Sequence, residues 1–324
     1  NIKESVESQG IPLVQWNLKI NRGVVTGYND AFIISENDKS LITNDDKESV
    51  KIIKPILRGK DISAWYPDYN NYYLIGTFPT LNLNIDDYPG IKNFLLSKGR
   101  SRLEQDGKGR KKTGNKWFET QDQISYWQDF QKPKIIYPNM TKYLPFIYDE
   151  HDHYFSNDKS FILTGKKLKN LTCFFNSKLF KYCFSDNFPE LQGGTKELRK
   201  IFFDKIPVKK ITAIEEIPFA KILDYLIALK KEKLQNDTDQ FILIYFEQIA
   251  NALVFEWYFK KEFEKASLSV AKHLEKLPDL NDNEIIIHQL RKIYIIMNQE
   301  NHPIHQAVFS MLSIPQIELI MNNN

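Results

Sequence analysis

The first half of the chain alternates short apolar runs with long polar connections. The runs are Val24–Val25, Ala31–Ile34, Tyr72–Ile75, Lys134–Tyr137 and Ser160–Leu163, each bounded by Gly, Pro, Asn or Asp. Short apolar runs between turn-forming residues are typical of β-strands. Long polar connections in a folded domain are either functional loops or disordered segments. This pattern predicts a β-rich domain over residues 1–165, with a mixed, twisted sheet and long loops.

The pattern becomes helical after residue 165. One apolar stripe at three- and four-residue steps predicts a helix over Lys166–Ser185, and its members are Leu168, Leu171, Phe175, Leu179 and Tyr182. Gly193-Gly194 then marks a turn, and Ile206-Pro207-Val208 ends this connecting segment, which spans residues 166–217.

The remainder, residues 218–324, is predicted to be an α-helical packing segment. Pro218 suits the first turn of a helix. Three further helices are expected over Asp239–Ala266, Asp282–Gln299 and Pro303–Leu312, joined by the polar loops Gln235–Thr238 and Lys276–Asn283. The three parts together define an α+β fold class.

Composition sets outer limits on the class of protein. The 324 residues suffice for one large or two medium domains, and 42% hydrophobic residues are enough to bury a core. The two cysteines, Cys173 and Cys183, fall in one predicted helix, so neither a disulfide framework nor a thiolate metal site is indicated. The lack of disulfides fits a reducing, cytoplasmic compartment.

Neither a membrane span nor a targeting segment is predicted. The most apolar window, Phe241–Phe259, is interrupted by Glu247, Gln248, Asn251 and Glu256, which favours a buried helix over a membrane span. The chain begins NIKESVESQG, without a signal peptide or an initiator Met, which suggests an excised piece of a longer protein.

The strongest local concentration of charge is the segment Ser97–Gln121, called the basic segment below. Its acidic residues are only Glu104, Asp106 and Glu119. Its cationic residues are Lys98, Arg100, Arg102, Lys108, Arg110, Lys111, Lys112 and Lys116. Such a segment on a chain of formal net charge +3 indicates a polyanion-binding face, and nucleic acid is the usual polyanion. Its glycines equally favour a solvated, mobile loop, and such loops often become ordered on DNA.

Other polar residues have the chemistry to read bases or phosphates. Arg bridges guanine O6 and N7, Gln or Asn bridges adenine N6 and N7, and Lys mainly engages phosphates. The candidates on this basis are Trp117, Gln121, Gln123, Tyr126, Asn139, Thr141, Lys142, Tyr143, Gln192, Thr195 and Lys196. Trp117 could instead occupy a core position. The residues flanking Gly193-Gly194 could simply form a turn.

Several common catalytic motifs are absent from the sequence. An adenine methyltransferase needs an Asn/Asp-Pro-Pro-aromatic tetrapeptide, and the sequence contains none; a P-loop and a Rossmann glycine pattern are also missing. Asp106-Gly107-Lys108 fits the acidic-x-Lys triplet of metal-dependent nucleases, with Asp86 or Asp87 upstream, but it lies in a glycine-rich loop unsuited to a rigid metal site. We therefore predict no catalytic residues and no metal ligands.

A second metal-like pattern is Asp149-x-His151-Asp152-His153. Two imidazoles in a His-x-His arrangement are compatible with Zn²⁺ or Mn²⁺. A polar turn beside the apolar run Phe146–Tyr148 explains the same residues without a metal, and we favour that interpretation.

An ordered series of strings resembles the target-recognition region of type IIG restriction–modification enzymes, which is related to the specificity subunits of type I systems. The strings are Asn21–Ile34, Ile53–Ile62, Lys116–Pro138, Phe174–Phe180, Gln192-Gly193-Gly194 and Ile206-Pro207-Val208. The tail Phe241–Ile314 also shows the resemblance, which therefore covers nearly the whole chain.

The resemblance implies a longer polypeptide in which a nuclease and an N6-adenine methyltransferase precede this region. S-adenosylmethionine and Mg²⁺ would serve those upstream domains, while this region would bind double-stranded DNA without catalysis and without a cofactor of its own. By position, Thr26-Gly27 and Leu57-Arg58-Gly59-Lys60 would be framework and phosphate-contacting elements. Residues 98–121 and 139–148 would face the DNA major groove. The competing hypotheses are a metal-dependent nuclease in its own right and a protein-interaction scaffold that does not bind DNA.

Overall fold

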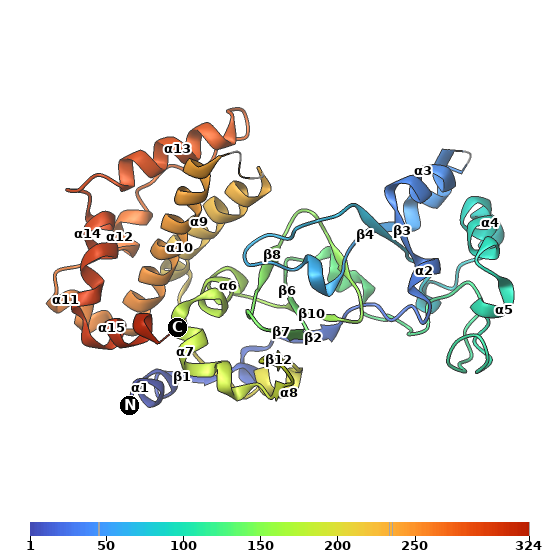
Figure 1. The fold of residues 1–324 in the computed structure, drawn as a ribbon, viewed down its shortest axis with the longest axis horizontal. Coiled ribbons are helices and arrows are strands. Elements are labelled where there is room, and N and C mark those ends of the chain that lie inside the picture. Colours follow the sequence, from blue (N-terminus) through green and yellow to red (C-terminus); the bar gives the residue numbers. More distant parts are fainter. Residues whose placement is uncertain (45, 233, 235, 324) are drawn as a thin grey trace.

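The computed structural model describes residues 1–44, 46–232, 234 and 236–323. The molecule is elongated, with a helical lobe at one end, a β-sheet in the middle and a smaller distal lobe at the other end (Figure 1). Both chain termini lie near the helical lobe (Figure 1). The combination of helices with small mixed sheets confirms the predicted α+β class.

The central sheet has four antiparallel strands in the order β2-β10-β6-β8. Their bounds are Lys19–Arg22 for β2, Ser160–Thr164 for β10, Lys134–Pro138 for β6 and Ile147–Asp149 for β8. The predicted strands at Lys134–Tyr137 and Ser160–Leu163 are thereby confirmed. All of β6 is buried, because both faces of this sheet are covered.

The distal lobe contains a second sheet, in the order β3-β5-β4-β9. Its strands are β3 (Ile33–Ser35), β5 (Tyr72–Ile75), β4 (Ile53–Leu57) and β9 (Phe155–Ser156), and only the β4–β9 pair is parallel. Its helices are α2 (Asn29–Phe32), α3 (Glu36–Asn44), α4 (Pro89–Ser97) and α5 (Arg100–Leu103).

Two of the predicted distal strands are wrong in part. Val24 forms only an isolated bridge to Asn157, and Ala31 and Phe32 belong to helix α2. The Thr26 hydroxyl accepts the N–H of Tyr28 at 3.1 Å and donates to Asn29 Oδ1 at 2.7 Å. These local bonds turn the chain into a helix where the apolar run alone predicts a strand.

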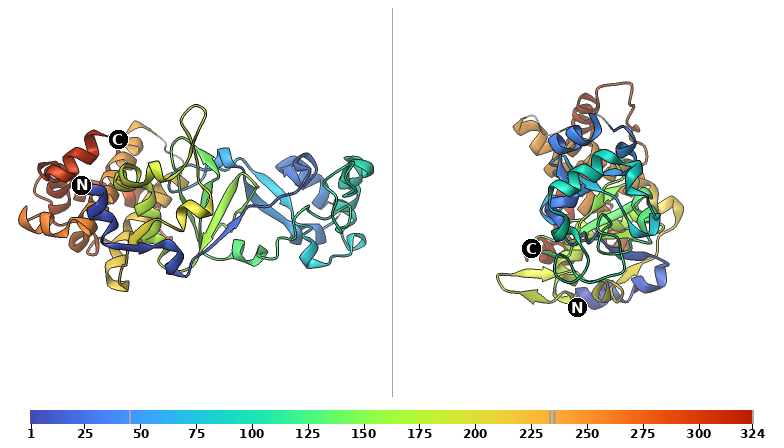
Figure 2. Two further views of the ribbon diagram at one scale, coloured as in Figure 1. Left: turned by 90° about the horizontal axis from the view of Figure 1, so that it is seen from below. Right: turned by 90° about the vertical axis from the view of Figure 1, so that its right-hand side faces the viewer.

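Two small sheets join segments that are far apart in sequence. Strand β1 (Gly10–Pro12) pairs with β13 (Pro207–Lys209), and β7 (Met140–Thr141) pairs with β12 (Thr195–Glu197), which forms a hairpin with β11 (Glu190–Leu191). The hairpin projects from the body of the molecule (Figure 2). Gly193 and Gly194 form its tip with φ of +78° and +76°, which favours glycine at both positions.

The helix predicted over Lys166–Ser185 is two helices, α6 (Leu168–Asn176) and α7 (Lys178–Phe184). Ser177 separates them, because its hydroxyl accepts the N–H of Phe180 at 3.1 Å and caps α7. The remaining short helices outside the helical lobe are α1 (Ile2–Glu7) and α8 (Lys200–Phe203).

The helical lobe confirms the predicted helical tail but changes several of its boundaries. Its helices are α9 (Ala213–Lys231), α10 (Asp237–Tyr258), α11 (Lys260–Lys265), α12 (Ala271–Leu274), α13 (Ile286–Met297), α14 (Pro303–Ser310) and α15 (Pro315–Asn322). Helix α9 begins before Pro218, because Thr212 and Glu215 form a capping box that satisfies free backbone N–H groups. The predicted loop Gln235–Thr238 begins at a residue outside the described ones, and α10 already includes Asp237.

Two hydrophobic clusters share the central sheet. Ile135, Tyr137 and Leu163 face the first cluster, which extends through α6, α7 and the helical lobe, whereas Ile136 and Ile162 face the second, in the distal lobe. Alternate residues of one strand thus serve different cores. The first cluster draws on all three predicted parts of the chain, and the division at residues 165 and 217 stays a prediction.

Among the described residues, no helix combines the length and the apolar character needed to cross a membrane. Most apolar side chains of α10 in that window pack into the first cluster, whereas Phe241 and Ile244 are exposed.

Candidate nucleic-acid interface

The basic segment is organised around a buried arginine. Arg110 is only 4% exposed, and its guanidinium donates to the carbonyl oxygens of Leu103, Thr26, Glu119 and Trp117 at 2.7–2.9 Å, twice to Leu103. Its Cζ also lies 5.1 Å from the centre of the Phe32 ring. Burial lowers the pKa of Arg110 to about 10.

This geometry corrects the prediction that Arg110 contacts DNA. A guanidinium has five N–H donors, and here every one is directed at a backbone carbonyl inside the protein. No donor remains for a base or a phosphate, so Arg110 supports the segment from within.

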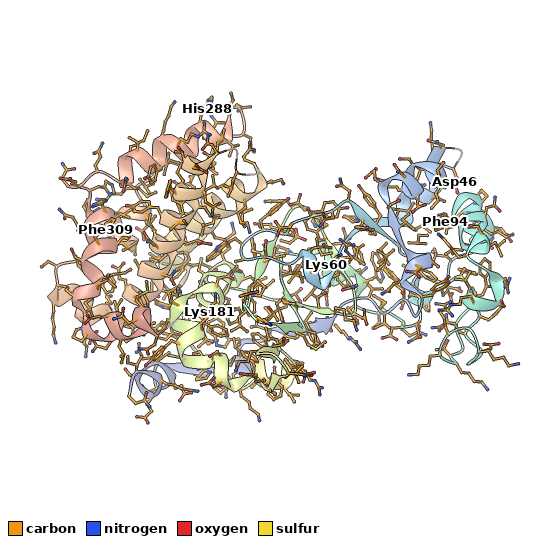
Figure 3. All side chains as sticks on the ribbon, in the orientation of Figure 1. Asp46, Lys60, Phe94, Lys181, His288 and Phe309 are labelled. Carbon is orange, nitrogen blue, oxygen red and sulfur yellow. The ribbon has the colours of Figure 1, made fainter. Side chains whose placement is uncertain are left out.

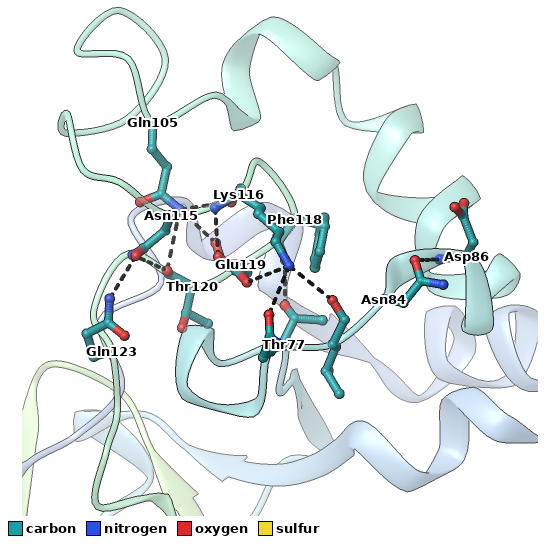
Figure 4. A network of polar contacts seen from close by, with 12 residues as sticks. Thr77, Asn84, Asp86, Gln105, Asn115, Lys116, Phe118, Glu119, Thr120 and Gln123 are labelled. Atoms are coloured by element: carbon teal, nitrogen blue, oxygen red, sulfur yellow. Dashed lines mark hydrogen bonds and ion pairs between the residues drawn. The ribbon is translucent and has the colours of Figure 1, made fainter.

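A second buried side chain, Gln105, holds the returning part of the basic segment (Figure 4). Its Nε2 donates to the carbonyls of Lys116, Glu119 and Thr120 at 3.1–3.4 Å, and its Oε1 accepts from the Thr113 hydroxyl at 2.7 Å. These bonds favour one defined conformation over the mobile loop that the glycines suggest. Sequence reasoning missed Gln105, because a glutamine among charged residues carries no signal of burial.

Three cations of the basic segment point to solvent. Lys108, Lys111 and Lys112 are exposed, and within the described part of the chain their side chains form no hydrogen bond or ion pair. They are therefore available to an anionic partner.

The other cations of the segment are partly engaged with neighbours. Arg100 pairs with Glu104 at 2.7 Å and lies over the Trp117 ring at 4.4 Å, and Arg102 lies over Tyr28 at 5.0 Å. Lys98 lies 4.6 Å from the Phe94 ring centre, and Lys116 Nζ lies 3.3 Å from Asn82 Oδ1. Arg100, Arg102 and Lys116 keep exposed side chains, so their roles as DNA contacts stay predictions.

The Thr26-Gly27 turn packs directly on the basic segment. Gly27 has a φ of +75°, and a Cβ there would lie 2.6 Å from Gln121 Oε1 and 3.0 Å from Arg110 Cδ. Glycine therefore satisfies both the backbone conformation and the close approach. Gln121, half-buried against this turn, has little freedom to reach DNA.

Gln123 and Tyr126 continue the surface beyond the basic segment. Gln123 is exposed and donates to Asn115 Oδ1 at 2.8 Å, and the half-buried Tyr126 donates its hydroxyl to the Arg22 carbonyl at 2.8 Å. Burial raises the pKa of Tyr126 to about 12, so the hydroxyl remains a neutral donor at physiological pH.

The fold brings a second group of predicted residues together on the β7–β12 pair. Thr141 lies opposite Lys196, and Asn139, Lys142 and Gln192 lie in the chain on either side of these strands. Lys142 and Gln192 are exposed, whereas Lys196 is largely covered and pairs with Glu190 at 2.9 Å. Tyr143, 78% exposed next to Lys142, gives this surface a projecting aromatic ring.

Arg58 and Lys60 differ sharply in their surroundings. Arg58 donates from Nε and Nη2 to Asp61 at 2.9 Å and lies 3.9 Å from the centre of the Tyr72 ring, which suits the framework role implied by the resemblance. Lys60 is exposed between the two lobes (Figure 3).

The carboxylates of the alternative nuclease have local structural partners. Asp106 accepts the N–H groups of Lys108 and Gly109 at 2.8 and 3.1 Å, which lowers its pKa and caps the turn. Asp86 pairs with Lys92 at 2.5 Å. Across the described ranges, no three His, Cys, Asp or Glu side chains are grouped to hold a metal ion.

The Asp149–His153 pattern has the form of a polar turn. Asp149 is buried, pairs with Lys134 at 2.7 Å and accepts the N–H groups of Asp152, His153 and Tyr154. Because the Asp149 carboxylate is occupied by these protein groups, it closes the turn after β8, and this supports the interpretation that requires no metal.

Residues 54–208, which enclose most of the surfaces described above, match the family of TaqI-like C-terminal specificity domains. This match over residues 54–208 confirms the predicted resemblance to a target-recognition region. Among curated proteins, no sequence match was found.

Two solved structures resemble the chain at low sequence identity. The type IIG restriction endonuclease BpuSI has a TM-score of 0.45 and 15% identity over 80% of this chain. The type IIL restriction–modification enzyme MmeI, solved in complex with DNA, has a TM-score of 0.48 and 8% identity over 92% of this chain. The matches cover 33% and 36% of those proteins, so this chain spans about a third of their length.

Proposed function

We propose that this chain is a double-stranded DNA recognition domain of a restriction–modification enzyme. The observation that carries the proposal is the match of residues 54–208 to a specificity-domain family, because that range contains the basic segment with its outward-facing lysines. The domain would direct an N6-adenine methyltransferase and a nuclease in the same polypeptide to their site. Those domains would supply the catalysis, with S-adenosylmethionine and Mg²⁺, while this chain supplies none.

Phosphate contacts would come from the exposed cations. Lys108, Lys111 and Lys112 lie on one organised loop, Lys60 lies nearer the middle of the molecule (Figure 3), and Lys142 directly follows strand β7. Lysine at a surface without carboxylate partners binds phosphate mainly as a point charge, so these contacts would set position and affinity and would read no sequence.

Base reading would come from exposed amides rather than from the lysines. Gln123 beside the basic segment and Gln192 on the projecting hairpin are exposed and have the donor and acceptor pair that recognises adenine N6 and N7. A recognition domain of this kind would hold the duplex in register while its methyltransferase partner rotates an adenine out of the stack.

The proposal is tested by fluorescence anisotropy on random-sequence duplex DNA across a salt series. The wild-type chain is expected to bind at low salt, with a steep negative slope of log affinity against log salt. The triple variant Lys108→Ala/Lys111→Ala/Lys112→Ala is expected to make that slope shallower by up to about 2.7, at about 0.9 per lost phosphate contact.

The matched control removes three exposed lysines from the helical lobe, Lys261, Lys265 and Lys292, and should leave the slope unchanged. Equal slopes for the two triple variants would show that the lysines of the basic segment do not contact DNA phosphates. Absence of binding by the wild-type chain at low salt would favour the interaction-scaffold hypothesis, and Mg²⁺-dependent cleavage by the chain would favour the nuclease.

A further inference from the structure

We propose that Arg110 is a positioning residue that holds the basic segment in its DNA-binding conformation before DNA arrives. The inference rests on the proposed function for its DNA partner, and on the buried hydrogen bonds of Arg110 for its mechanism. In this inference Arg110, the most buried cation of the segment, supports the loop from inside, whereas the neighbouring lysines contact DNA phosphates.

The bonds of Arg110 join three stretches of backbone. Leu103 ends helix α5, Thr26 belongs to the turn before α2, and Trp117 with Glu119 lies on the returning part of the segment. One side chain therefore ties both ends of the loop to each other and to a turn 84 residues earlier in the chain. Because no other cation of the segment reaches these carbonyls, the geometry depends on the five donors of a guanidinium.

The backbone of the loop closes around the same residue. The Arg110 N–H donates to the Glu104 carbonyl at 2.8 Å, the Arg110 carbonyl accepts the Gly107 N–H at 3.0 Å, and the Thr113 N–H donates to the Gln105 carbonyl at 3.1 Å. Gly109 packs so closely that a Cβ would lie 2.4 Å from the Ser101 carbonyl oxygen. The loop tip is thus closed on the backbone next to α5.

The inward direction of Arg110 accompanies the outward direction of the lysines beside it. Lys108 precedes Arg110 by two residues and Lys111 and Lys112 follow it, and all three are exposed while Arg110 is 4% exposed. If Arg110 were released, these lysines would sample many positions, and DNA binding would have to restrict them again. Ordering a loop upon binding opposes association, so a loop already ordered binds more tightly for the same number of phosphate contacts.

The test compares Arg110→Lys, Arg110→Met and Lys111→Met with the wild-type chain by anisotropy across a salt series. Arg110→Lys keeps the charge but cannot satisfy four carbonyls in this planar arrangement. It is expected to weaken binding about tenfold at fixed salt with an unchanged salt slope, as is Arg110→Met, because the phosphate contacts survive. Lys111→Met should instead make the slope shallower by about 0.9. Wild-type affinity in Arg110→Lys, with a shallower slope in Arg110→Met, would overturn the inference and place Arg110 on DNA.

A second measurement needs no DNA. Hydrogen exchange of the free chain should show slow exchange for the loop amides of Arg110 and Thr113 in the wild type and much faster exchange in Arg110→Lys, while the central sheet keeps its protection. Equal loop exchange in both proteins would overturn the inference. Failure of the proposed function is distinguishable, because it appears as a wild-type chain that does not bind DNA.

If both Arg110 variants fail to fold, Gln105→Met serves in the same two assays. Gln105 is neutral and buried, and it holds the returning part of the same loop through Lys116, Glu119 and Thr120. Its loss should speed exchange in the loop and weaken binding without changing the salt slope. Unchanged exchange and unchanged affinity would show that the loop does not need this internal support.

Discussion

Lys134 and Asp149 form an ion pair inside the central sheet, with Nζ and Oδ2 2.7 Å apart and side chains 0% and 2% exposed. Lys134 begins β6 and Asp149 ends β8, directly opposite it in the register. Lys134 Nζ also donates to the Phe130 carbonyl at 2.8 Å. The pair thus closes the end of the sheet and anchors the turn that follows β8.

Breaking this pair should destabilise the protein strongly. Asp149→Asn leaves the Lys134 ammonium buried without a counter-ion, and we expect a loss of about 3–5 kcal/mol in the free energy of unfolding. Urea or thermal unfolding measures it. The control is Lys51→Ala, which removes the exposed pair with Glu48 and should change stability by less than about 1 kcal/mol. A similar small effect of Asp149→Asn would contradict the structure of this site.

Gly27→Ala should distort the turn on which the basic segment rests. The φ of +75° and the contact with Gln121 and Arg110 both oppose a side chain. We expect a loss of about 1–3 kcal/mol in stability and weaker DNA binding. Gly114→Ala is the matched control, because a Cβ there meets nothing within 4 Å. Equal stability of the two variants would argue against this packing of the turn.

Substitutions of Arg58 and Lys60 should distinguish a structural role from a contact with DNA phosphates. Lys60→Ala is expected to make the salt slope of DNA binding shallower by about 0.9 and to leave the melting temperature unchanged, because the side chain is exposed. Arg58→Ala should lower the melting temperature and keep the slope, because Asp61 then loses its ion pair. The opposite pattern would exchange the two roles.

Gln192→Ala should change what is read rather than how tightly DNA is held. If the exposed amide bridges an adenine, its removal lowers discrimination at one base position by about 1–3 kcal/mol and leaves the salt slope intact. Selection of bound sequences from a random library measures this for both proteins. Identical selected sites would exclude Gln192 from base reading.

The capping box of α9 should contribute to the acid sensitivity of the protein. The bond from the Thr212 backbone N–H lowers the pKa of Glu215 from its ordinary value of 4.5. Because the folded pKa lies below the unfolded one, the contribution is present above pH 4.5 and is lost as the pH falls through the folded pKa. Glu215→Gln should therefore lose stability at neutral pH and depend less on pH in acid, as thermal unfolding at several pH values would show. A wild-type pH dependence in the variant would contradict this assignment.

The hydrophobic pattern was sufficient for elements that are stabilised by local spacing and burial. The runs at Lys134–Tyr137 and Ser160–Leu163 are strands because β-branched and aromatic residues alternate between two covered faces. The helices after residue 165 could be predicted from apolar positions at helical spacing, but the break at Ser177 between α6 and α7 and the break at Phe259 between α10 and α11 could not. A single hydroxyl or a local change of backbone angle ends a helix without altering the apolar pattern around it.

For the candidate interface, the sequence by itself determined the location and sign of the charge and the motifs of a specificity domain. Tertiary structure alone decided which cations face outward. Arg110 and Lys111 are adjacent and chemically similar, yet one is buried and the other exposed. The carbonyl of Thr26 that helps to hold Arg110 lies 84 residues away, and the pairing of β7 with β12 brings Thr141 opposite Lys196, 55 residues later in the chain. Local pattern cannot reveal such partners, because the direction of a side chain depends on which distant backbone groups the fold brings within hydrogen-bonding distance.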